Sequence, residues 1–179
     1  PALSVIGAQA KLVTIEEGAE LDLAMFVINT TGGKAKIETN GTLKMEGTTA
    51  QKSWLEDTNT GHEVVLGTDS TIVYSGGSSP VNVWTGPYKN LTLEKSIVAH
   101  DTSGVLGELK VDKGINMKGG ISALTIQATT MTVTGDMKVS GNNPVSITCT
   151  TRLTADGKVE VSSTGASALF TVTSPNQEY

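Results

Sequence analysis

A turn residue recurs along the chain at intervals of 21 to 26 residues, and this repeat restricts the possible folds more than any other feature of the sequence. The repeat positions are Gly18, Gly41, Gly67, Asn90, Gly114, Gly135 and Gly157. The steps between them are 23, 26, 23, 24, 21 and 22 residues. Short bursts of alternating apolar and polar residues follow these positions, as in Leu43-Lys44-Met45. Such alternation is typical of a strand with one buried face. The repeat therefore predicts a stack of similar turns, each built from two or three short strands.

The fold class expected from this pattern is all-β, in the form of a single-stranded right-handed parallel β-helix, or β-solenoid. Residues 1–179 form one domain of about seven coils of 21–26 residues. Equivalent residues of successive coils lie above one another, so inward Leu, Val, Ile and Met form columns along the axis. We expect Gly or Asn at the repeat positions because the corner there requires a positive φ.

The alternation also predicts which side chains are buried and which face water. The expected core positions are Leu43, Met45, Leu91, Leu93, Val111, Met117, Met137, Val139, Val159 and Val161. The expected solvent-facing positions between them are Lys44, Thr92, Lys138 and Glu160.

One step is longer than the others, and the polar, aperiodic segment 51–63 accounts for it as an inserted loop outside the regular coil. No segment combines strong helix formers with a 3.6-residue period over three turns, so almost no helix is expected. The apolar segment 1–9 is expected to act as an N-terminal cap or joint.

A β-sandwich is the alternative architecture, because short strands separated by frequent turns suit it as well. A sandwich has no constant period of this length and usually buries large aromatic residues. Aromatic residues make up only 4% of this chain. Both observations favour the solenoid.

Charge and apolar content exclude several classes of partner. The net charge is −5 and no basic stripe is present, which argues against binding to nucleic acid. No apolar run approaches the length needed to span a bilayer. Cys149 has no second cysteine to pair with and is expected to be a small buried residue. Asn-x-Thr sequons at Asn29, Asn40 and Asn90 leave glycosylation open.

Residues 71–83, TIVYSGGSSPVNV, followed by Tyr88-Lys-Asn-Leu-Thr-Leu93, resemble a repeat of large secreted surface proteins and adhesins of Bacteroidota. That repeat has a strand ending in Tyr-x-Gly and later Tyr-x-Asn-Leu-x-Leu. The likeness is close over about one coil, and Trp84-Thr-Gly-Pro87 departs from the usual run of small residues. The resemblance implies an extracellular or cell-surface location and an adhesive or filament-forming role.

The titratable residues do not form a recognisable catalytic pattern, so we expect that the protein is not an enzyme. Adjacent Glu16 and Glu17 would point to opposite faces of an extended segment. His100-Asp101 lies near Ser103, but neighbours in sequence do not create the geometry of a catalytic triad. No cofactor is expected.

A calcium ion is the one cofactor that the sequence leaves open. Asp57, Asn59 and Glu63 place oxygen donors around Gly61, as at the start of a calcium loop. The remaining ligands of such a loop are missing, so an ordinary loop is the alternative.

Three aromatic residues offer a possible carbohydrate platform. Trp84 and Tyr88 lie beside a turn, and Trp54 lies in the inserted segment. Such rings can stack on sugars, or they can fill a corner of the core.

The function expected from these features is that of a structural subunit or segment of an extracellular filament or cell-surface adhesin. A parallel stack exposes unpaired strand edges at its two ends, and these edges can pair with another copy. The expected interface consists of Leu3, Val5, Ile6, Leu169, Phe170 and Val172. The alternative is a carbohydrate-binding adhesin or tailspike-like module that uses Trp84 and Tyr88.

Overall fold

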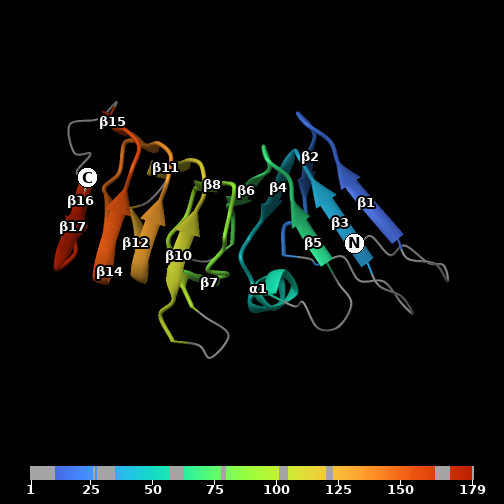
Figure 1. Cartoon of the computed structure of the whole chain (residues 1–179), viewed down its shortest axis with the longest axis horizontal. Coiled ribbons are helices and arrows are strands. Elements are labelled where there is room, and N and C mark those ends of the chain that lie inside the picture. Colours follow the sequence, from blue (N-terminus) through green and yellow to red (C-terminus); the bar gives the residue numbers. More distant parts are fainter. Residues whose placement is uncertain are drawn as a thin grey trace.

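A computed structural model describes residues 11–25, 27, 35–56, 63–77, 80–100, 105–119, 123–163 and 170–178. The strands stack along the long axis of the molecule as a parallel β-solenoid of about six turns, which confirms the predicted fold class (Figure 1). Every strand pairing in the described part of the chain is parallel; one isolated antiparallel bridge joins His100 and Leu106. A β-sandwich, which is built from antiparallel strands, is therefore wrong.

The first face of the solenoid is a sheet that runs through the whole stack. Its seven strands, in spatial order, are β2 (Glu20–Asp22), β4 (Thr42–Met45), β6 (Thr71–Tyr74), β8 (Asn90–Leu93), β11 (Ile115–Gly119), β13 (Met137–Gly141) and β15 (Val159–Ser163). Each of the seven repeat positions lies at the start of one of these strands or within four residues before it. Seven strands are separated by six steps, which is why the structure has about six turns rather than the seven coils expected.

The second face is formed by β7 (Val81–Val83), β9 (Ile97–Ala99), the first parts of β12 (Leu124–Val133) and β14 (Val145–Ala155), and β16 (Phe170–Thr173). The pairing of β12 with β14 shifts between Ala128 and Thr130, where the chain turns onto a third face. There β10 (Glu108–Val111) pairs with β12, and β17 (Asn176–Glu178) pairs with β14. In the N-terminal turns, β1 (Lys11–Ile15), β3 (Ala35–Thr39) and β5 (Glu63–Leu66) form a separate three-stranded sheet.

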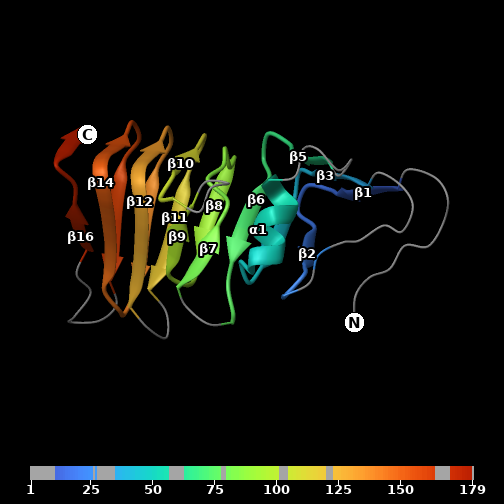
Figure 2. The same ribbon diagram turned by 90° about the horizontal axis from the view of Figure 1, so that it is seen from below.

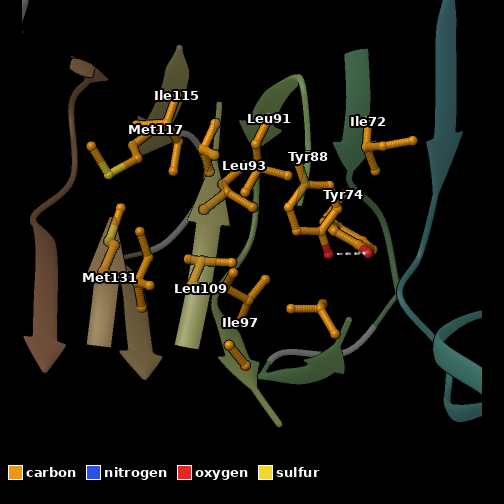
Figure 3. Packing of buried hydrophobic residues seen from close by; sticks show 14 of the residues in the cluster. Ile72, Tyr74, Tyr88, Leu91, Leu93, Ile97, Leu109, Ile115, Met117 and Met131 are labelled. Atoms are coloured by element: carbon orange, nitrogen blue, oxygen red, sulfur yellow. Dashed lines mark hydrogen bonds between the residues drawn. The ribbon is translucent and has the colours of Figure 1, made fainter. Parts of the chain in front are cut away.

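Inward side chains of the first face form two continuous apolar columns. The register aligns Leu21, Leu43, Ile72, Leu91, Ile115, Met137 and Val159 in one column. The second contains Met45, Tyr74, Leu93, Met117, Val139 and Val161. Figure 3 shows the central part of this packing. Eight of the ten expected core residues are buried, and the exceptions are Val159 and Val161.

Three of the four expected solvent-facing positions differ from the prediction. One of them is Glu160, which is partly buried. Thr92 is buried and Lys44 is only partly exposed, whereas Lys138 is exposed as expected. Thr92 lies between Val73 and Asn116 in a column of outward-facing residues on the first face. The two adjacent strands, or rungs, lie about 4.8 Å away and therefore cover its short side chain.

The corners need glycine for a different reason from the one expected. Among the repeat positions only Gly18 has a positive φ, of 77°. At Gly135 a Cβ atom would collide with the backbone carbonyl of Lys113, and at Gly157 it would collide with the backbone of Gly135. Stacked corners therefore approach so closely that a side chain does not fit between them.

The inserted segment begins as a helix and not as a loop. Helix α1 (Thr49–Glu56) takes the place of a second-face strand and contacts β7, the first strand of that face (Figure 2). Trp54 and Leu55 are buried in the common core. The segment 51–56 is thus part of the packed structure, which contradicts the expected outlying loop. Residues 57–62 lie outside the described part of the chain.

Gln51 fixes the start of this helix. Its side-chain oxygen accepts hydrogen bonds from the backbone N–H groups of Gly47 and Thr48, at 2.8 and 3.1 Å, while the Thr48 hydroxyl accepts one from the Gln51 N–H. This is the reciprocal arrangement of a capping box. The side-chain nitrogen of Gln51 donates to the Ala24 carbonyl at 2.7 Å, which ties the helix to the first turn.

Candidate functional site: the ends of the solenoid

The last strand of the first face leaves apolar side chains exposed. Val159 and Val161 point inward, in the columns of Met137 and Val139, yet they are 37% and 52% exposed. Strand β15 pairs with β13 on one side, and no described strand pairs with its other side. The two valines therefore occupy core positions with no described strand on their outer side.

The second face ends in the same way. On β16, Phe170 and Val172 are partly buried against the core, and no described strand pairs with the outer side of β16. These two residues belong to the interface expected from the sequence. The other expected residues, Leu3, Val5, Ile6 and Leu169, lie outside the described residues.

The opposite end of the first face is strand β2. Leu23, next to it, is buried and Leu21 is partly buried, whereas Glu20 and Asp22 are exposed. The carboxylate of Asp22 lies 3.6 Å from the Lys44 ammonium. No described strand covers the outer side of β2.

The sequence did not identify β2 or β15 as interface strands, because their patterns are the same as those of the buried strands between them. Whether a strand lies at the edge of the stack depends on its neighbours and not on its own residues.

The aromatic residues near Trp84 form a core cluster and not an open platform. The rings of Trp84 and Tyr88 meet edge to face with centroids 5.1 Å apart, and those of Tyr88 and Tyr74 with centroids 6.2 Å apart. Tyr88 is fully buried and Trp84 is partly buried, so a sugar has no access to two adjacent ring faces. Trp54 is also buried.

The hydroxyl groups of Tyr74 and Tyr88 and the carbonyl of Trp84 form a chain of two hydrogen bonds. The Tyr88 hydroxyl donates to the Trp84 carbonyl at 2.6 Å. It also lies 2.9 Å from the Tyr74 hydroxyl, as the dashed line in Figure 3 marks. Because the Tyr88 proton is used for the Trp84 carbonyl, Tyr74 is the donor in the second bond. Burial raises the pKa of both Tyr74 and Tyr88 well above the ordinary value.

The structure describes only a few of the residues considered for chemistry. Asp57, Asn59, Asp101 and Ser103 lie outside the described residues, as does the side chain of Glu63. The His100 ring nitrogen Nδ1 lies 3.0 Å from Asn82 Oδ1. No group of three or more His, Cys, Asp or Glu side chains that could hold a metal occurs within the described ranges.

Cys149 is buried, as predicted, and burial raises the pKa of its thiol to about 11. A thiol with this pKa remains protonated, and therefore unreactive, at neutral pH.

Of the part of the chain that the structure describes, no helix has the length and apolar character needed to cross a membrane. Comparison with models of protein families, with curated proteins and with solved structures finds no match.

Proposed function

We propose that the chain is a structural subunit or segment of an extracellular filament or cell-surface adhesin, and that copies associate end to end through the exposed strand edges. The observation that carries the proposal is the exposure of Val159 and Val161, two inward residues of the last rung. A second rung placed on β15 would bury both side chains and satisfy the free backbone groups of the edge.

The arrangement of the strands favours an open polymer over a closed dimer. All rungs are parallel, so the two ends of the stack present different strands. Contact between unlike ends leaves a free end of each kind after every addition, which generates a filament unless the rotation closes a ring. The extracellular setting is supported by the resemblance of residues 71–93 to surface proteins.

The alternative of a carbohydrate-binding adhesin or tailspike-like module has less support, because Tyr88 is buried and only Trp84 presents part of a ring. A surface carbohydrate remains a possible partner in that alternative. Binding on a glycan array, lost in Trp84→Ala, would be its signature.

Sedimentation velocity and negative-stain microscopy over a range of concentrations test end-to-end assembly. Val161→Lys places a charge at the exposed inward position of the last rung and should abolish polymers while the circular dichroism spectrum stays β-rich. Thr148→Lys is the matched control, because Thr148 is an exposed residue on the side of the stack and its change should leave polymers intact. A wild-type chain that stays monomeric at high concentration contradicts the proposal, and so does a Val161→Lys variant that polymerises normally.

A further inference from the structure

We infer that the C-terminal edge strand β15 accepts strand β2 of a second copy of this chain in one register, with Val159 beside Leu21 and Val161 beside Leu23. This inference rests on the proposed end-to-end assembly and specifies its partner and its geometry.

Strand β2 fits because it is the opposite edge of the same sheet. The register is constant across all six steps of the first face, from β2 to β15. Moving a second copy along the axis by the length of the stack therefore brings its β2 onto β15 as one more parallel rung. Both edges carry apolar residues at the inward positions, so the two core columns continue across the joint.

Registers shifted by one or two residues pair the apolar side chains of β15 and β2 less well than the unshifted register does. A shift of one residue turns the inward side chains of one strand outward. A shift of two residues in one direction sets Val159 beside Ala19, in the exposed turn before β2. The opposite shift sets Glu160 beside Ala24, where β2 has already ended and the backbone has a positive φ of 46°. Only the unshifted register gives each valine an apolar partner on β2 or directly after it.

The proposed joint contains one attractive and one repulsive pair of charges. Lys158 lies opposite Glu20 in this register, and both residues are exposed. One step further, Glu160 lies opposite Asp22, which is a like-charged pair. Each of these two carboxylates already has a lysine beside it, since Lys158 lies 2.5 Å from Glu160 and Lys44 lies 3.6 Å from Asp22.

Removal of the repulsive pair should strengthen the association at the joint. Glu160→Gln removes the like-charged pair and releases Lys158 for Glu20. Because a like-charged cross-strand pair costs several tenths of a kcal/mol, the change should lower the concentration needed for assembly about twofold to fivefold.

Engineered cysteines test the register directly. In Asp22→Cys/Glu160→Cys the two Cα atoms at the joint would be about 4.8 Å apart, within the range that a disulfide spans. In the control Glu20→Cys/Glu160→Cys the positions are offset by two residues, about 8 Å apart on the diagonal, which a disulfide does not bridge. Native Cys149 is buried in all variants and adds no accessible thiol.

Oxidation followed by non-reducing electrophoresis should give a series of covalent multimers for the first pair only. Multimers for the control pair, or for neither pair although microscopy shows polymers, would overturn the register and leave end-to-end assembly standing. Absence of polymers from the wild-type chain would instead remove the proposed function, and the inferred register with it.

Discussion

Replacement of the two buried tyrosines by phenylalanine should have unequal effects on stability. In Tyr88→Phe the Trp84 carbonyl loses its donor and the Tyr74 hydroxyl loses its acceptor. The buried Tyr74 hydroxyl and the partly buried Trp84 carbonyl are then left without these partners, at about 1 to 2 kcal/mol each, so the free energy of unfolding should fall by about 2 to 4 kcal/mol. In Tyr74→Phe the Tyr88 hydroxyl still donates to Trp84, and the loss should be about 1 kcal/mol.

Urea unfolding followed by tryptophan fluorescence measures both changes, and an unchanged m-value would show that the unfolded state is comparable among the variants. The two substitutions remove the same atom from rings that are equally buried. Hydrophobic differences therefore largely cancel, and the inequality reports the direction of the hydrogen bonds. An equal or larger loss in Tyr74→Phe would refute the assigned direction.

Three further predictions concern the corners, the helix and the tyrosines. Gly135→Ala should destabilise the fold by about 3 kcal/mol or more in thermal unfolding, because the new methyl group meets the Lys113 backbone. Gly18→Ala, which has open space around it and a positive φ, should cost only about 1 to 2 kcal/mol; equal losses would contradict the role of close stacking. Gln51→Ala should cost about 2 to 3 kcal/mol in the same assay because it removes the helix cap and the bond to Ala24, whereas the exposed Ser53→Ala should be nearly neutral. The raised pKa values of Tyr74 and Tyr88 mean that the folded state retains phenolic protons that the unfolded chain releases above about pH 10. Their contribution to stability is thus complete below that pH and is lost as the pH rises further, so the melting temperature should fall more steeply between pH 9.5 and 11.5 in the wild type than in the double phenylalanine variant, and parallel curves would contradict this assignment.

The strands of the first face could be predicted from the sequence because their information is local. Alternation such as Leu43-Lys44-Met45 and a turn residue before it need no knowledge of the neighbouring coil. The corners were placed correctly but explained wrongly, since the contact between Gly135 and Lys113 joins two successive turns. Val159 has the same local pattern as the buried Met137, and the two differ in that no described strand pairs with the outer side of β15.

Helix α1 and the contact between Tyr74 and Tyr88 were harder to predict from the sequence, for two different reasons. The capping box formed by Thr48 and Gln51 is visible in the sequence, but the helix that follows is short and lacks a long apolar period. The contact between Tyr74 and Tyr88 could not be predicted, because it requires knowing that the two residues meet inside adjacent turns. The interface residues Val159 and Val161 were predicted as ordinary core for the same physical reason.

The replacement of a strand by α1 has a mechanical consequence. Tension along the long axis of the solenoid acts parallel to the hydrogen bonds between successive turns. The bonds at the junction between two turns can therefore break one after another, without shear of a whole sheet. The second-face sheet begins at β7, after α1, so among the described residues the second face contributes no ladder bonds at the junctions between β2 and β4 and between β4 and β6. At the next junction no described residues pair β5 with the segment before β8. These three junctions should yield under load before those from β8 to β15. A released turn of about 23 residues would lengthen the chain by roughly 75 Å, which would let the solenoid extend between β2 and β8 while the stacked turns from β8 to β15 stay folded.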